Sequence, residues 1–169
     1  MNTPLANMLR YERWATLRLV DACRRLTDEQ LDARHEWASG PVRELLLHLV
    51  GGQQTFVLRT KGRQHEGELN RGSAWPGFDT LAGIAADAGE ELVHVAESLE
   101  ADADVELGWM GHTYRYPVSF FLVHAVEHGV EHRTEIKLAL AAIGVATPDL
   151  DGWEFAAAMG YGEEAPAKP

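Results

Sequence analysis

Three histidines stand four residues apart in the stretch SFFLVHAVEHGVEHRTEI, at His124, His128 and His132. Four residues of an α-helix turn by about 400° and climb about 6 Å, so these side chains form one nearly vertical column. Two imidazoles at positions i and i+4 are able to hold one metal ion, and this spacing recurs in helical zinc sites. The outer pair is separated by about 12 Å along the axis, so the column supplies two ligands and its third histidine has another role.

A third ligand must come from another element, and His48 in RELLLHLVGG is the candidate. It lies three residues after Leu45 and four before Gly52, on the apolar stripe that faces a bundle core. Two histidines from one helix and one from a facing helix leave a metal position open for water or substrate, as catalytic sites do. The alternative is that His48 is a hydrogen-bonded core residue and the column a surface feature. Metal binding is favoured because the column shares its helix with many apolar residues: Phe120, Phe121, Val123, Ala125, Val126, Ile136 and Leu140.

The other histidines lie in polar loops or beside acidic residues, and we expect them at the surface: His35, His65, His94 and His112. A stripe of Glu127, Glu131 and Glu135 runs beside the column. It is predicted to be a solvated acidic edge, with the alternative that Glu127 or Glu131 orients an imidazole. Cys23 falls on the apolar face of the first predicted helix and is predicted to be a core residue rather than a nucleophile.

Two known metal patterns match the column poorly. Both pairs of neighbouring histidines fit H-x-x-E-H, the pattern of inverted zincin peptidases. Only 37 residues follow His132, however, too few for the further ligand and substrate cleft of those enzymes. Di-iron bundle proteins need a glutamate three residues before each histidine, but Ala125 and Gly129 precede His128 and His132. Both classes are disfavoured.

The elements that must position these histidines are predicted from helical periodicity. Long helices are expected over about 3–25, 39–61, 79–103 and 117–143, with Asp79 capping the third, and a short helix over 150–160. Thr27 and Gln30 form a capping box for one extra turn. Residues 104–119 predict a small hairpin or an extended crossover. The fold class is therefore all-α, a four-helix bundle with a long crossover between the third and fourth long helices and a short C-terminal helix.

The second long helix contains Gly51 and Gly52 in its middle. Each glycine costs about 1 kcal/mol relative to alanine in a helix interior, so the pair indicates close approach of another backbone or a ligand. We see no repeat and no boundary, which predicts one domain over residues 1–169, with about 162–169 as a frayed tail.

The overall composition limits the partners. A formal charge of −11 argues against a nucleic-acid partner and against docking to anionic membranes. A small-molecule substrate remains open. The single cysteine favours a reducing compartment, and the charged N-terminal stretch is neither a signal sequence nor a membrane span. The sequence thus predicts a cytoplasmic, bacterial-style protein.

Four segments resemble the DinB/YfiT-like superfamily, bacterial four-helix bundles with a metal site whose related groups include thiol S-transferases using bacillithiol or mycothiol. YERWATLRLVDACRRLTDEQL resembles the family's opening helix, with Trp14 in its usual aromatic place. SGPVRELLLHLVGGQQ resembles the segment that carries the first ligand. HAVEHGVEHRTEI resembles the family signature H-x-x-x-H-R-G-Q, and LDGWEFAAAMG the terminal helix. The chain departs from the pattern at Thr134-Glu135, where Gly-Gln is usual, and at Gln53-Gln54, where an acidic residue often follows the first ligand.

The resemblance implies that His48, His128 and His132 hold a divalent metal ion, Zn²⁺ or Ni²⁺, with His124 as a neighbour above the site. It favours a metal-dependent thiol S-transferase that acts on a small electrophile with a low-molecular-weight thiol. The alternatives are a hydrolase that uses metal-activated water, and a non-enzymatic metal-binding or stress-related bundle that forms a homodimer through its first helices.

Three residues are candidates to face a substrate: Gln53, Trp14 and Tyr114. Core packing or surface exposure is the alternative for each, and the catalytic residues are not identified by the sequence.

Overall fold

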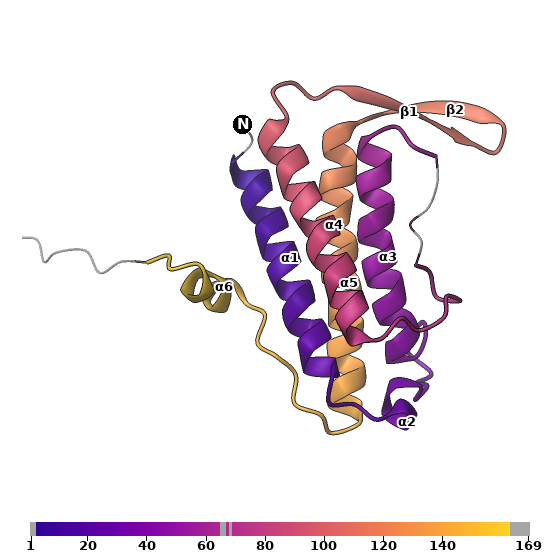
Figure 1. Ribbon diagram of the computed structural model, residues 1–169, viewed down its shortest axis with the longest axis vertical. Coiled ribbons are helices and arrows are strands. Elements are labelled where there is room, and N and C mark those ends of the chain that lie inside the picture. The colour runs from indigo at the N-terminus through magenta and orange to yellow at the C-terminus, as the bar shows by residue number, and fades with distance from the viewer. Residues whose placement is uncertain (1–2, 65–66, 68, 163–169) are drawn as a thin grey trace, which may run out of the picture.

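Four long helices form a bundle in the computed structural model, which describes residues 3–64, 67 and 69–162 (Figure 1). They are α1 (Thr3–Cys23), α3 (Val42–Thr60), α4 (Phe78–Ser98) and α5 (Val118–Ala142). Two short helices, α2 (Asp28–Leu31) and α6 (Gly152–Ala158), flank the bundle. The prediction of a helical bundle with a short C-terminal helix is confirmed.

The segment between α4 and α5 is an antiparallel hairpin of β1 (Asp104–Trp109) and β2 (His112–Pro117). Its strands pair from Asp104 with Pro117 to Trp109 with His112, and Gly111 takes a φ of 80° at the turn. The hairpin lies across one end of the bundle (Figure 1). Of the two predictions for this segment, the small hairpin is therefore the correct one.

The path of the chain places α3 beside α5. Helix α1 packs mainly on α4 and α5, and α3 packs on the same two helices. Because α3 and α4 run in the same direction, the connection between them returns along the length of the bundle, and its described parts are residues 61–64, 67 and 69–77 (Figure 1). The connection therefore lies against α3, and α3 is the helix that carries His48.

Local chemistry sets the helix ends. The side chain of Thr27 accepts from the backbone of Gln30 while the Gln30 side chain accepts from the backbone of Thr27, so the predicted capping box is confirmed. The predicted cap of the third long helix is wrong: Gly77 is the N-cap of α4, and Asp79 lies in its first turn. There the carboxylate of Asp79 accepts a 2.6 Å hydrogen bond from Arg24 instead of capping the backbone.

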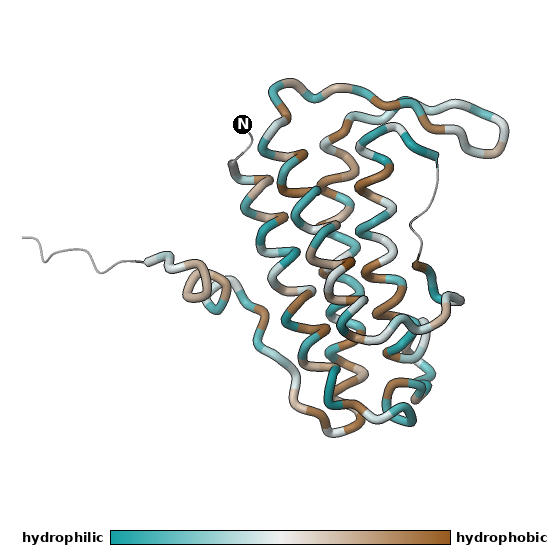
Figure 2. Tube along the Cα trace, in the orientation of Figure 1, coloured by the Kyte–Doolittle hydropathy of each residue, from teal (hydrophilic) through white to brown (hydrophobic). Residues whose placement is uncertain are grey.

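Hydrophobic residues recur along each long helix (Figure 2), and their buried side chains form the core of the bundle. Cys23 is completely buried there, as predicted, and burial raises the pKa of its thiol to about 12. Helix α6 docks through Phe155, whose ring lies 5.6 Å from those of Tyr11 and Trp14. Trp14 thus packs against α6 on one side, and it also lines a cavity of about 520 Å³ together with Arg10 and Arg18.

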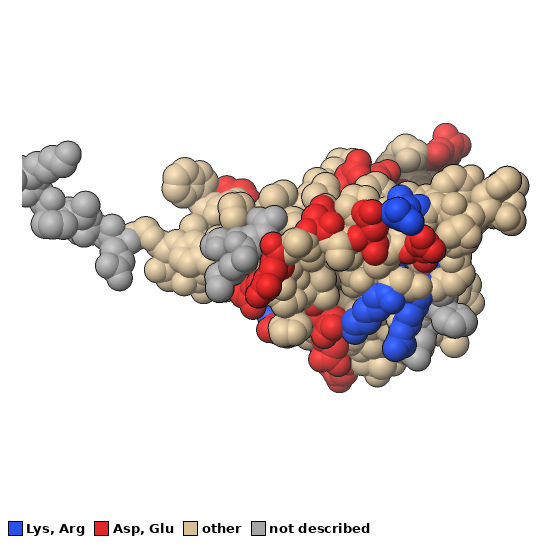
Figure 3. Space-filling view, turned by 90° about the horizontal axis from the view of Figure 1, so that it is seen from above, with Lys and Arg blue, Asp and Glu red and all other residues tan. Residues whose placement is uncertain are grey.

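The excess of acidic over basic residues in the sequence is visible at the surface. Viewed from the hairpin end, acidic side chains are spread widely and a small group of basic ones stands among them (Figure 3). Across the described ranges, none of the helices is both long and apolar enough to cross a membrane. The predicted frayed tail falls almost wholly on residues 163–169, which lie outside the described part of the chain.

Candidate metal centre

The antiparallel packing of α3 and α5 brings His48 together with His128 and His132. Ring centroids lie 5.0 Å apart for His48 and His128, 4.6 Å for His48 and His132, and 4.4 Å for His128 and His132. One ring nitrogen from each histidine lies within 4.8 Å of the other two. The three residues that the sequence analysis selected therefore meet at one point, and we call them the histidine trio.

The spacing of the histidine trio suits a small tetrahedral ion. Nε2 of His128 lies 3.3 Å from Nε2 of His48. Two nitrogens that each stand about 2.0–2.1 Å from a tetrahedral zinc are about 3.3 Å apart, so this pair already has the needed separation. Nδ1 of His128 is buried and has no hydrogen-bond partner in the described part of the chain.

Burial keeps His48 and His128 in the form that binds metals. Burial, together with the neighbouring His132 and His48, lowers the pKa of His128 to about 3. Burial also lowers the pKa of His48, helped by the charges of His132 and Arg71. Both rings are neutral at pH 7, and a neutral imidazole has the lone pair that a metal ion requires.

Glu135 orients His132, a role that the sequence analysis did not give it. Its Oε2 lies 3.3 Å from Nδ1 of His132, and the backbone N–H of Ser39 donates to its other oxygen. Burial raises the pKa of Glu135, but the hydrogen bonds from Ser39 and His132 outweigh it and the net shift is downward. An ionised carboxylate on Nδ1 fixes the tautomer and leaves Nε2 free for a ligand. Glu127 and Glu131 are exposed, as predicted.

The glycine pair in α3 is explained by two close approaches. A Cβ at Gly52 would stand 3.0 Å from both ring nitrogens of His128 and nearer still to Cε1. A Cβ at Gly51 would overlap the carbonyl of Leu69, in the segment that returns along the bundle. The predicted close approach of another backbone is confirmed at Gly51, whereas Gly52 leaves room for a side chain, the ring of His128.

A buried polar network lies behind the histidine trio. Glu12 of α1 is paired with Arg133, the residue after His132, and both are almost fully buried. The side-chain nitrogen of Gln53 lies 3.3 Å from the hydroxyl of Thr16 in the same network. Gln53 is 1% exposed, so it belongs to the core and does not face a substrate. Gly129 is the residue whose type reflects this network, because a Cβ at this position would overlap the Glu12 carboxylate.

His124 stands outside the trio. Its ring packs 4.8 Å from Phe56 and 5.7 Å from Phe120, and no ring nitrogen of His124 joins the group of metal-ligating atoms in the described residues. Tyr114 is exposed on the hairpin.

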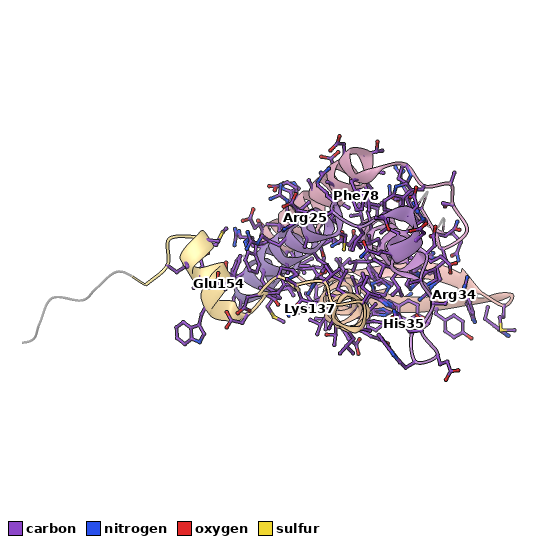
Figure 4. All side chains as sticks on the ribbon, turned by 90° about the horizontal axis from the view of Figure 1, so that it is seen from below. Arg25, Arg34, His35, Phe78, Lys137 and Glu154 are labelled. Atoms are coloured by element: carbon purple, nitrogen blue, oxygen red, sulfur yellow. The ribbon has the colours of Figure 1, made fainter. Side chains whose placement is uncertain are left out.

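The other described histidines also lie away from the histidine trio. His94 and His112 are exposed, and His35 stacks on Trp37 at the opposite end of the bundle from the hairpin (Figure 4). His65 lies outside the described residues.

Two facing helices that bring three histidines together define a helical-bundle protein whose site is compatible with metal binding. The chain belongs to the DinB family, whose family model matches residues 1–165. It is similar to the crystal structure of a DinB-like protein from Bacillus cereus, with a TM-score of 0.64 and 21% sequence identity over 86% of this chain and 94% of that one. That similarity shows the shared fold. No curated protein matches the sequence.

Proposed function

We propose that His48, His128 and His132 bind one divalent cation, Zn²⁺ or Ni²⁺, and that the protein is a metal-dependent thiol S-transferase acting on a small electrophile. The observation that supports this proposal is the meeting of three ring nitrogens, from two facing helices, within 4.8 Å of one another. The membership of the DinB family agrees with it.

The number of ligands favours a reactive site over a structural one. Structural zinc sites are usually closed by four protein ligands, whereas catalytic sites use three and keep one position open. In the described residues, no cysteine, aspartate, glutamate or fourth histidine joins the trio. A divalent ion held there supplies Lewis acidity that lowers the pKa of a thiol or of water. The contact of the Glu135 carboxylate with Nδ1 of His132 favours the tautomer that leaves Nε2 as the nitrogen for a ligand.

Thiol transfer is preferred to hydrolysis because of the resemblance to thiol S-transferases, since the same open position would also accept water. A reducing cytoplasm, consistent with the single buried cysteine, would keep a low-molecular-weight thiol available. A homodimer through α1 is a separate proposal, tested by the mass of the protein in sedimentation equilibrium.

Substitution with Co²⁺ tests the proposal, because cobalt reports its ligands in the visible spectrum. We expect the cobalt form to show a four-coordinate spectrum and to gain a sulfur-to-cobalt charge-transfer band when 2-mercaptoethanol is added. His132→Ala should lose both signals, whereas His124→Ala should keep them. Cobalt binding without any response to thiols would contradict the transferase and favour the hydrolase, if ester or amide substrates then turn over. Cobalt binding with neither response would leave a metal-binding protein without turnover.

A further inference from the structure

A cavity of about 310 Å³ lies between the second half of α3, the start of α5 and the hairpin. Its wall is rich in aromatic side chains: Phe56, Trp109, Tyr116, Phe120 and Phe121. The volume is at the lower end of the range for small-molecule sites, which are concave and mostly apolar. The size and lining suit a flat apolar group of about one ring.

Only one layer of side chains separates this cavity from the histidine trio. Phe56 and His124 both line the cavity. The Phe56 ring lies 5.4 Å from that of His128, and the His124 ring lies 6.5 Å from it. The cavity therefore adjoins the proposed metal site through His128, and His124 stands at the boundary between them.

The charged end of the cavity is Arg59, the one Lys, Arg, Asp or Glu side chain among the lining residues that the structure describes. Its guanidinium donates to the carbonyl oxygens of Gln64 at 2.7 Å and Arg63 at 3.3 Å, both through one nitrogen, which holds the group in place. A guanidinium has five N–H donors in a planar fork that suits a carboxylate. Arg59 lies eleven residues beyond His48 on α3, about 16 Å along the axis, so the charge lies at the end of the cavity away from the trio.

Hydrogen bonds between the loop after α3 and the hairpin keep the cavity open. The Gln64 side chain donates to the carbonyl of Gly108 at 2.6 Å and accepts from its N–H at 2.7 Å. This bidentate contact joins the two segments that form the rim. A site that is already formed binds its ligand without the cost of ordering loops.

We infer that the cavity binds the aromatic portion of a small carboxylate substrate, with the carboxylate on Arg59 and the reactive atom directed past His124 toward the histidine trio. This inference rests on the proposed function and narrows its substrate class to aromatic acids. It follows from the aromatic wall, from the single cation at the far end, and from the contact with the His128 ring.

Phenylacetate and its neutral isostere phenylacetamide test the inference by calorimetry on metal-free protein. We expect phenylacetate to bind about tenfold more tightly, because its carboxylate makes charge-assisted hydrogen bonds with Arg59. Arg59→Gln should remove the difference between the two ligands, whereas Arg63→Gln, an exposed neighbour outside the lining, should keep it. Phe120→Ala should weaken both ligands, and Val123→Ala, exposed on the same helix but outside the lining, should weaken neither.

The orientation toward the trio is tested with metal-loaded protein. Ring protons of bound phenylacetate should relax faster in the Ni²⁺ form, which is paramagnetic, than in the Zn²⁺ form. Absence of binding, or a preference for phenylacetate that survives Arg59→Gln, would overturn the inference. Equal relaxation in the two forms would overturn the orientation. Because the calorimetry uses metal-free protein, a failure of metal binding is seen separately and contradicts the proposed function alone.

Discussion

Replacing Gly52 with alanine should greatly weaken metal binding while the chain stays folded. The new Cβ would overlap Cε1 of His128 and stand 3.0 Å from both of its ring nitrogens, and an ordinary contact needs about 3.4 Å, so the ring must move by more than 0.4 Å. Metal–ligand distances tolerate only about 0.2 Å. Loss of a residue that merely orients a ligand costs about 10–100-fold in affinity. Displacement of the ligand itself should therefore cost about 100-fold or more.

Isothermal titration with Zn²⁺ measures the affinity, and urea unfolding of the metal-free protein measures the free energy of unfolding. Alanine gains about 1 kcal/mol over glycine in a helix, which offsets part of the cost of moving the ring. Gly83→Ala in α4 is the matched control, because a Cβ there meets nothing within 4 Å. It should raise stability by about 0.5–1 kcal/mol and leave zinc binding unchanged. Wild-type zinc affinity in Gly52→Ala would refute the reasoning.

Three further predictions concern the surroundings of the trio. Gly129→Ala should lower the free energy of unfolding by about 3–5 kcal/mol in urea, because its Cβ displaces Glu12 from a buried ion pair. Glu135→Gln should weaken zinc binding about 10–100-fold in a chelator competition, because His132 loses its carboxylate partner. Burial lowers the pKa of His128 to about 3, so the unfolded chain binds more protons between about pH 6.5 and 3. The urea midpoint of the metal-free protein should fall as the pH drops through that range and should not fall above pH 7.

For each of these three predictions, one experimental result would contradict the reasoning. A Gly129→Ala variant as stable as Gly83→Ala would show that Glu12 can move without cost. Glu127→Gln is the control for Glu135→Gln, since Glu127 is an exposed glutamate on the same helix, and equal zinc affinities in the two variants would deny Glu135 an orienting role. A urea midpoint that is flat between pH 7 and 4 would contradict a buried neutral His128.

The helices and the histidine trio were predictable because their signals are local. The i, i+4 spacing places His128 and His132 on one face of a helix whatever the rest of the fold does. His48 was identified by its place on an apolar stripe, and the Gly51-Gly52 pair by its cost in a helix interior. These features depend on helical periodicity and not on how distant segments meet.

Features that depend on distant contacts were missed. Glu12 pairs with Arg133 across 121 positions of the chain, and no local pattern links the two. The carbonyl of Leu69, in the connection between α3 and α4, lies against Gly51 of α3, and no local pattern in the sequence reveals this contact. Glu135 is a different case: it lies three residues after His132, a spacing at which helical side chains meet, but the acidic stripe as a whole was expected to be solvated.

The most direct test of the metal site is the metal content of untagged protein by elemental mass spectrometry, with wild type, His132→Ala and His124→Ala purified side by side. The account predicts about one divalent ion per chain in wild type and in His124→Ala, and none in His132→Ala. No ion in wild type, even after incubation with Zn²⁺ or Ni²⁺, would contradict it, as would an ion that His124→Ala loses and His132→Ala retains.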